Sequence, residues 1–257
     1  MSKQIELLPD ERLDEVNEKI TIIQKKDGLT FGTDAYFLAS FIKQQRYARA
    51  VELGAGTGII SLLCASKDKL GSIYAIEIQK DFYDIAKRNA ELNELDERIR
   101  LICDDVRKVS SADVGGEVDV VFTNPPYMTV DSGKRNDSDR KYIARHEVCG
   151  DIGDFCAAGR RLLKHGGRFY CVWRPDRLSS LFVAMKNNAL EPKRLVFVHG
   201  DANAEPSMVL VSATKGGAEG LRILPPIVLH ETDTKNDGAR MLTQKANRIY
   251  ETMNITE

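Results

Sequence analysis

The segment 52–61 has the composition of a loop that approaches a ligand closely. Three glycines, Gly54, Gly56 and Gly58, alternate with other residues directly after the expected strand residues 50–53. Glycine lets a backbone turn tightly and come near a ligand because it has no Cβ. The segment joins an expected strand to an expected helix, which is the setting of a nucleotide-binding loop. A tight turn without a ligand is the alternative.

Two features of this loop disfavour a dinucleotide. The dinucleotide fingerprint G-x-G-x-x-G needs a glycine where this sequence has Ile59. The carboxylate of Glu52 stands two residues before the first glycine, and a pyrophosphate binds best to helix N–H groups with no carboxylate nearby. S-adenosylmethionine carries no phosphate, and its sulfonium and amino groups are cationic. We therefore expect the loop to bind S-adenosylmethionine through Glu52 and the three glycines.

Further acidic positions follow the next two expected strands. Glu77 lies about 20 residues after the loop, where a carboxylate in nucleotide-binding folds accepts hydrogen bonds from ribose hydroxyls. Asp104 and Asp105 follow the run 98–103. One of these two carboxylates would accept from the amino group of adenine, while Val106 offers its backbone N–H. We expect Glu77, Asp105 and Val106 to bind the cofactor, and ordinary exposed acids are the alternative.

Asn124-Pro125-Pro126-Tyr127 follows directly on the apolar run 118–122. The Asn124 side chain and the Pro125 carbonyl supply two oxygen acceptors, and the two prolines fix the backbone. A planar amine such as the exocyclic nitrogen of adenine has two hydrogens, so two acceptors would orient it for attack. Tyr127 would stack on the base. We predict that Asn124, Pro125 and Tyr127 are catalytic, with Asn124 also beside the cofactor. A proline-rich turn without chemistry is the alternative.

The order of the elements around these motifs predicts an α/β fold. Extended runs at 50–54, 72–77, 98–103, 118–123 and 168–172 alternate with helical stretches at 57–67, 80–93, 151–163 and 176–187. Parallel strands need crossover connections, and these cover both faces of a sheet. Gly166-Gly167 is the expected stop of the third helix. The runs 194–199 and 208–214 are joined by a short polar loop and predict an antiparallel hairpin at the sheet edge.

Two terminal segments flank the expected catalytic domain at 35–230. The segment 1–34 is too short for a separate domain, and Thr33 or Asp34 is expected to cap a helix that follows at 35–41. The tail 231–257 is polar and is expected to form a helix within 239–253.

The composition excludes several classes of protein. The 257 residues carry 37 basic and 38 acidic side chains, a formal net charge of −1, which excludes a globally basic nucleic-acid binder but not a local basic patch. Five cysteines without a Cys-x-x-Cys pair fit neither a disulfide framework nor a zinc site, so we expect no metal. No apolar run approaches the roughly 18 residues of a membrane span. We expect a cytoplasmic protein, either a monomer or a weak homodimer, that does not contact a membrane.

The motifs described above resemble, in their order along the chain, those of class I S-adenosylmethionine-dependent amino-methyltransferases. They lie at 52–58, 77, 105–106 and 124–127. Segments at 11–14, 23–24, 31–35 and 224–228 are similar to the bacterial tRNA (adenine-N6)-methyltransferase family that modifies the adenosine beside the anticodon of a valine tRNA. The resemblance implies a single Rossmann-like class I methyltransferase domain, with a mostly parallel sheet and an antiparallel C-terminal hairpin. It also implies S-adenosylmethionine as the cofactor and an RNA partner, with tRNA expected. By the same resemblance, Thr33 and Asp34 bind the cofactor, and the segment 1–34 packs over the cofactor site.

A segment rich in basic residues follows the Asn-Pro-Pro-Tyr motif. It would clamp RNA phosphates, and three aspartates in the same stretch leave a merely solvated loop as the alternative. The candidate RNA-binding residues are Lys134, Arg135, Arg140, Lys141 and Arg145.

Two alternative functions stay open. A protein glutamine N5-methyltransferase would also act on a planar nitrogen with two hydrogens. Such enzymes usually have a helical domain ahead of the glycine loop, for which the residues before Glu52 leave little space. The other alternative is a catalytically inactive RNA-binding module of the same fold. The presence of Glu52, Glu77 and Asn124 argues against that module, because it would not need them.

Overall fold

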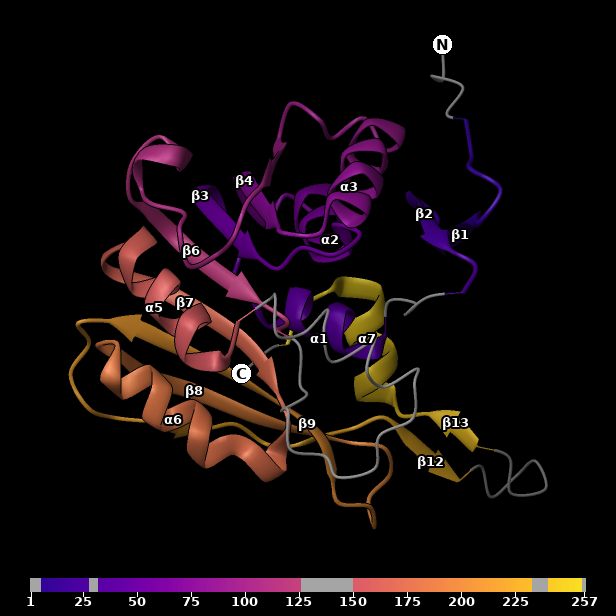
Figure 1. Cartoon of the computed structure of the whole chain (residues 1–257). Coiled ribbons are helices and arrows are strands. Elements are labelled where there is room, and N and C mark those ends of the chain that lie inside the picture. The colour runs from indigo at the N-terminus through magenta and orange to yellow at the C-terminus, as the bar shows by residue number, and fades with distance from the viewer. Residues whose placement is uncertain (1–5, 28–31, 126–149, 233–239, 256–257) are drawn as a thin grey trace, which may run out of the picture.

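The computed structural model describes residues 6–27, 32–125, 150–232 and 240–255, which fold around one large sheet (Figure 1). Five strands of this sheet are parallel neighbours in the order β7-β6-β3-β4-β5. Their bounds are β3 (Gln45–Leu53), β4 (Leu70–Glu77), β5 (Ile99–Cys103), β6 (Val118–Thr123) and β7 (Leu163–Trp173). Because β3 is flanked by β4 on one side and β6 on the other, the strand order reverses there, which is where open α/β sheets bind ligands.

Helices cover both faces of the sheet because successive strand residues point to opposite sides. In β3, Ala50 belongs to one hydrophobic cluster and Val51 to the other, and Val120 and Val121 alternate in the same way in β6. Residues of α1, α2 and α7 complete the first cluster, and residues of α5 and α6 the second. The α-helices of the described residues are α1 (Thr33–Phe41), α2 (Ile59–Ser66), α3 (Lys80–Leu92), α5 (Ile152–Leu162), α6 (Leu178–Asn187) and α7 (Gln244–Thr252). Short 3-10 helices are η1 (Ala112–Val114) and η2 (Pro175–Arg177).

The predicted α/β architecture is confirmed, and so is the antiparallel hairpin, but its place at the sheet edge is wrong. Strand β9 (Pro206–Lys215) runs antiparallel to both β7 and β8 (Leu190–His199). Two short strands, β10 (Arg222–Ile223) and β11 (Ile227–Val228), then pair in parallel with β8. An uncovered edge strand exposes unpaired N–H and C=O groups, and these two strands pair with part of that edge.

The glycine pair at 166–167 does not stop a helix, so that expectation is wrong. Helix α5 ends at Leu162, β7 begins at the next residue, and both glycines lie inside the strand. Gly166 has a φ of +77°, and the pairing of β7 with β6 shifts register around this point. The pair therefore forms a bulge, a use of glycine that the sequence pattern does not distinguish from a helix stop.

The cap expected for α1 is also wrong. Thr33 is already the first helical residue, and the N-cap is Gly32, which supplies no side-chain hydrogen bond. The Asp34 side chain lies in the first turn and hydrogen-bonds a residue outside the helix, described below.

The N-terminal segment contains a hairpin that the sequence analysis did not predict. Strands β1 (Glu11–Asn17) and β2 (Ile20–Lys25) pair with each other in an antiparallel sheet of their own. Asn89 of α3 fastens this hairpin: its Oδ1 accepts from the N–H of Ile23 (2.6 Å), and its Nδ2 donates to the carbonyl oxygens of Ile23 (3.2 Å) and Thr57 (2.9 Å). One buried side chain therefore links β2 to the glycine-rich loop.

The helix expected within 239–253 is present as α7, and an unexpected strand precedes it. Strand β13 (Arg240–Leu242) pairs with β12 (His230–Thr232), and α7 follows.

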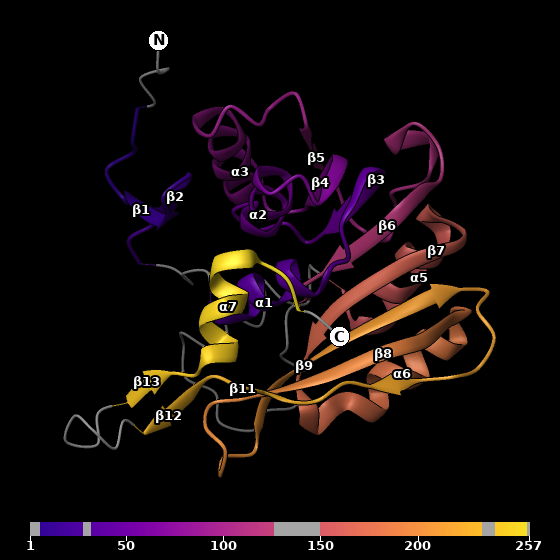
Figure 2. The ribbon, with the colours of Figure 1, turned by 180° about the vertical axis from the view of Figure 1, so that it is seen from behind.

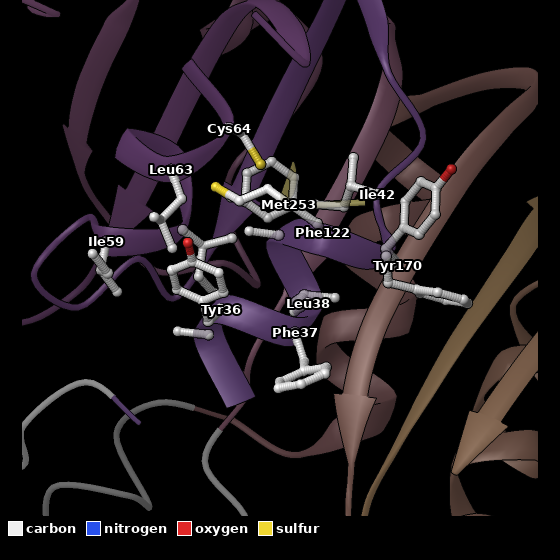
Figure 3. Packing of buried hydrophobic residues seen from close by; sticks show 14 of the residues in the cluster. Tyr36, Phe37, Leu38, Ile42, Ile59, Leu63, Cys64, Phe122, Tyr170 and Met253 are labelled. Carbon is white, nitrogen blue, oxygen red and sulfur yellow. The ribbon is translucent and has the colours of Figure 1, made fainter. Parts of the chain in front are cut away.

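Helix α7 docks on α1, as Figures 1 and 2 both show. The Tyr36 hydroxyl donates to the carbonyl oxygen of Tyr250 (2.7 Å), and the centroids of the two tyrosine rings lie 4.9 Å apart. The buried ammonium of Lys69 donates to the carbonyl oxygens of Ala39 (2.7 Å) and Met253 (2.8 Å), so it joins the ends of both helices. Figure 3 shows Met253 in the same apolar cluster as Tyr36.

Candidate active site

The predicted site residues meet because their strands are parallel. β3, β4, β5 and β6 all end at the same edge of the sheet, at Leu53, Glu77, Cys103 and Thr123. The glycine-rich loop, Glu77, the two aspartates after β5, and Asn124 with Pro125 after β6 therefore lie on one side of the sheet. This edge is the candidate active site.

The three glycines of the loop adopt backbone conformations that favour glycine. Their φ angles are +69° at Gly54, +55° at Gly56 and +81° at Gly58. A Cβ at Gly58 would lie 3.3 Å from the Cβ of Ala86, so this glycine lets α3 come close. A Cβ at Gly56 would meet no atom within 4 Å. The loop thus presents its backbone to open space at Gly56, as a loop that receives a ligand requires.

Glu77 holds the glycine-rich loop in place. It is buried, and its Oε2 accepts from the N–H of Gly56 (2.8 Å) while Oε1 accepts from the N–H of Gln79 (2.9 Å). Burial raises the pKa of Glu77, and the backbone N–H groups oppose that rise because they favour the charged form. A carboxylate oxygen can accept more than one hydrogen bond, so these two contacts leave room for ligand hydroxyl groups.

Glu52 is an almost completely buried carboxyl group with only one satisfied oxygen. Its Oε2 accepts from the backbone N–H of Ser61 (3.1 Å) and from the Ser61 hydroxyl, and Oε1 has no hydrogen-bond partner among the described residues. Burial raises the pKa of Glu52 to about 8. An oxygen in this state favours a hydrogen-bond donor or a positive charge over a phosphate.

Asp105 is engaged by a neighbour in its own turn. Its carboxylate accepts from Nη2 (2.6 Å), Nε (2.9 Å) and the backbone N–H (2.9 Å) of Arg107, which lowers the pKa of Asp105. Asp104, by contrast, is exposed. Val106 is buried, and its carbonyl accepts from Nη2 of Arg161 (2.7 Å). Of the two aspartates, Asp104 is therefore the more accessible to a ligand.

Asn124 is oriented by a residue from a distant part of the chain. Its Nδ2 donates to Oδ2 of Asp34 (2.7 Å), which identifies Oδ1 as the accepting side of the amide. The preceding Thr123 ties β6 to β3 by donating from its hydroxyl to the carbonyl of Leu53 (2.8 Å). A Cβ at Gly32 would lie only 2.5 Å from Oδ1 of Asp34, so Gly32 gives that side chain its space.

Sequence reasoning missed the pairing of Asp34 with Asn124. It expected both residues at the cofactor but not in contact with each other. They stand 90 positions apart, so no spacing rule links them. Thr33 is exposed at the start of α1, and Pro125 is buried after Asn124.

Several predicted residues lie outside the described part of the chain. They are Tyr127, Lys134, Arg135, Arg140, Lys141 and Arg145.

Within the described ranges, no group of three or more His, Cys, Asp or Glu side chains is placed to hold a metal ion. In the same ranges, no helix has the length and apolar character needed to cross a membrane.

Known proteins resemble this chain in both sequence and fold. Residues 25–187 match the family model described as methyltransferase small domain. A protein from Bacteroides fragilis named tRNA1(Val) (adenine(37)-N6)-methyltransferase is 29% identical over 197 residues, which cover 77% of this chain and 82% of that protein. A protein of the same name from Tolumonas auensis is 26% identical over 215 residues, which cover 83% of this chain and 87% of that protein.

Two solved structures illustrate the likeness in fold. A predicted O-methyltransferase from Agrobacterium tumefaciens gives a TM-score of 0.69 at 21% identity, covering 87% of this chain and 98% of that chain. TYW2 from M. jannaschii, solved in complex with AdoMet, gives a TM-score of 0.54 at 16% identity, covering 82% of this chain and 88% of that chain. At such identities the likeness shows the fold alone.

Proposed function

Because the chain belongs to the methyltransferase small domain family, we propose that it is an S-adenosylmethionine-dependent methyltransferase acting on the exocyclic N6 amine of an adenine in RNA. The proposed RNA is a tRNA, and the proposed position is next to the anticodon. Relatives named tRNA1(Val) (adenine(37)-N6)-methyltransferase, which align with most of the chain, support this substrate. The observation that carries the proposal is the Asn124 amide, fixed by Asp34 at the carboxyl edge of the sheet.

The residues at this edge fit S-adenosylmethionine. When bound, the cofactor supplies a methyl group activated for transfer to nitrogen. Gly56 borders open space, and the carboxylate of Glu77 beside it suits ribose hydroxyls. Oε1 of Glu52, which has no hydrogen-bond partner among the described residues, suits a positively charged ligand better than a phosphate, because the positive charge would favour the ionised carboxylate. The remaining proposed cofactor residues are Thr33, Asp34, Gly54, Gly58, Asp105, Val106 and Asn124.

Positioning of the substrate amine accounts for most of the proposed catalysis. Oδ1 of Asn124 and the carbonyl oxygen of Pro125 accept the two hydrogens of the amine, and Asp34 holds the Asn124 side chain in one orientation. Correct orientation of two reactants lowers a barrier by about 7–11 kcal/mol at most. Tyr127 stacks on the adenine in this proposal. No strong base is needed, because the amine proton becomes acidic only as the new bond forms.

The proposal extends to partners and surroundings. The basic residues Lys134, Arg135, Arg140, Lys141 and Arg145 contact the RNA backbone, and the segment 1–34 packs over the cofactor. The link from β2 through Asn89 to Thr57 supports that position of the segment. We place the enzyme in the cytoplasm, with its tRNA substrate, as a monomer or weak homodimer that uses no metal.

Transfer of a radiolabelled methyl group tests the function. The wild-type protein is incubated with labelled S-adenosylmethionine and either total tRNA or total protein, and labelled RNA is digested to nucleosides. We expect label in tRNA, as N6-methyladenosine. Label confined to protein glutamine would identify the alternative enzyme, and no label with retained RNA binding would identify the inactive module.

Asn124→Ala separates the proposed chemistry from folding. We expect its kcat to fall about 100-fold, because the amine loses one of its two acceptors and its orientation. The matched control is Asn188→Ala, which removes an amide after α6 at the opposite edge of the sheet and should retain activity. Equal activity of Asn124→Ala and wild type would refute the role of the amide.

A further inference from the structure

A hollow with both polar and apolar lining lies beside the candidate active site, and Thr33 alone among its described lining residues is a proposed cofactor residue. The hollow has a volume of about 490 Å³ and lies between the end of β1, the start of α1 and one face of α7. Thr33, Tyr36, Asn247, Tyr250 and Glu251 are among its lining residues. Binding sites for small organic groups have volumes of about 300–1,000 Å³, so the hollow is large enough for one nucleoside.

The lining of the hollow has the chemistry of a nucleobase site. Tyr36 and Tyr250 form a tilted ring pair, and the ring of a half-buried tyrosine such as Tyr250 is a platform on which a base stacks. Asn247 and Glu251 stand four residues apart on α7, so their side chains share one face. The amide both donates and accepts hydrogen bonds, and the carboxylate accepts from base N–H groups.

The same lining disfavours a phosphate. None of the described residues that line the hollow is Lys or Arg, and Glu251 places a negative charge there. A phosphate would need cations or helix N–H groups, and Glu251 would repel it. An uncharged, planar group with N–H donors fits the hollow better.

The hollow adjoins the first turn of α1, which also carries the residue that orients Asn124. Thr33 lines the hollow, and the next residue, Asp34, hydrogen-bonds Asn124. The first turn of α1 therefore separates the hollow from the proposed target amine. A nucleotide next to the target adenosine in the same RNA strand would have to occupy space close to this turn.

We propose that the hollow between β1, α1 and α7 binds the base of a nucleotide flanking the target adenosine, through stacking on Tyr250 and hydrogen bonds to Asn247 and Glu251. This inference rests on the proposed RNA substrate. It makes Asn247 and Glu251 specificity determinants, whereas Asn124 and Asp34 act on the methylated base itself.

The test measures binding of a fluorescent anticodon stem-loop RNA of valine tRNA by anisotropy, so that it does not depend on methylation. Three forms of the RNA are compared: the intact strand, and strands with an abasic residue on the 5′ or the 3′ side of the target adenosine. For the wild-type protein, we expect one of the two abasic strands to bind about tenfold more weakly, because the stacked base is missing.

The variants Asn247→Ala and Glu251→Ala decide whether that base occupies the hollow. Each should weaken binding of the intact RNA about five- to tenfold and should reduce the penalty of the abasic strand, since both changes remove the same contact. Gln244→Ala, on the same helix but outside the hollow, should behave like wild type. Thermal unfolding and S-adenosylmethionine affinity should be unchanged in all three variants, which distinguishes lost base contacts from a displaced α7.

The outcomes separate this inference from the proposed function. If the wild type methylates tRNA but the abasic penalty is equal in wild type and in both hollow variants, the inference is wrong and the function stands. If the hollow variants change the abasic penalty but no methyl group is transferred to RNA, the function is wrong and the base site stands. If the wild type neither binds nor methylates the RNA, both are refuted.

Discussion

At the scale of single residues, the site depends on two acidic groups in opposite surroundings. Asp34 is half-buried and accepts a hydrogen bond from Asn124, whereas Glu52 is buried with one oxygen unsatisfied among the described residues. The first group fixes the side chain that we propose to hold the substrate. The second group, Glu52, is buried with that unsatisfied oxygen, which destabilises the fold, and a bound cation would offset this destabilisation.

Removal of the Asp34 carboxylate should slow methyl transfer without unfolding the protein. In Asp34→Ala, the Asn124 amide loses the hydrogen bond that sets its orientation, and we expect kcat to fall about 100-fold. The measurement is tRNA methylation at saturating cofactor, together with S-adenosylmethionine affinity. Asp81→Ala, which removes an acidic residue from the first turn of α3, is the control. Wild-type kcat in Asp34→Ala would show that Asn124 does not need this partner.

The titration of Glu52 should give the cofactor-free protein a specific pH dependence. Burial raises its pKa from 4.5 to about 8, so the folded protein holds a proton that the unfolded chain has lost between these values. The stabilisation by this group is complete below pH 4.5 and is lost as the pH rises through 8. In Glu52→Gln the side chain is neutral throughout, so the stability of the variant relative to wild type should increase from pH 5 to pH 8.

Urea unfolding at pH 5, 6.5 and 8 checks this prediction. Glu97→Gln, a change at an exposed glutamate, should show no change relative to wild type over this range. Parallel pH profiles for wild type and Glu52→Gln would mean that Glu52 is charged in the fold.

At the scale of elements, the N-terminal hairpin is coupled to the glycine-rich loop by one helix. Asn89 lies in α3 and hydrogen-bonds Ile23 of β2, and Asn93 is the C-cap of α3 and hydrogen-bonds Thr21 of β2. Of the two, only Asn89 also donates to Thr57 in the loop. The two asparagines therefore form a matched pair, in which one connects hairpin and loop and the other holds the hairpin alone.

Asn89→Ala and Asn93→Ala should differ in cofactor binding. Each leaves β2 backbone groups without a partner and should lower the free energy of unfolding by about 1–3 kcal/mol. Only Asn89→Ala should weaken S-adenosylmethionine binding, by roughly fivefold for one lost hydrogen bond to the loop. Calorimetric titration and urea unfolding measure the two quantities. An equal effect of both variants on cofactor affinity would show that the contact with Thr57 is irrelevant to binding.

At the scale of the whole molecule, charge is balanced, with a formal net charge of −1. An RNA partner must therefore be attracted by local groups of basic residues and not by the protein as a whole. The segment after the Asn-Pro-Pro-Tyr motif contains such a group.

Simultaneous change of Lys134, Arg135, Arg140 and Lys141 to Ala should weaken tRNA binding and reduce its dependence on salt. Each lost phosphate contact lowers the slope of log affinity against log salt by about 1. Binding is measured between 50 and 200 mM salt, with cofactor affinity as the folding control. A matched variant changes four lysines elsewhere to Ala: Lys19, Lys67, Lys87 and Lys108. Equal salt slopes in the two variants would discard the basic segment as a phosphate clamp.

The sequence by itself determined the order of the elements and the residues at their ends. Strand alternation and glycine-rich turns are local properties, and parallel strands bring their carboxyl ends to one edge, so Glu52, Glu77 and Asn124 could be assigned to a common site. Local pattern was also enough to indicate the antiparallel pairing of β8 and β9.

Only the tertiary structure decided which distant residues touch. The bond between Asp34 and Asn124, the pairing of β10 and β11 with β8, and the docking of β2 through Asn89 join parts of the chain that carry no common local signal. Gly166-Gly167 shows the same limit, since a glycine pair permits both a helix stop and a strand bulge. Packing selects between such possibilities because hydrogen bonds and burial are satisfied by the whole fold, not by neighbours in sequence.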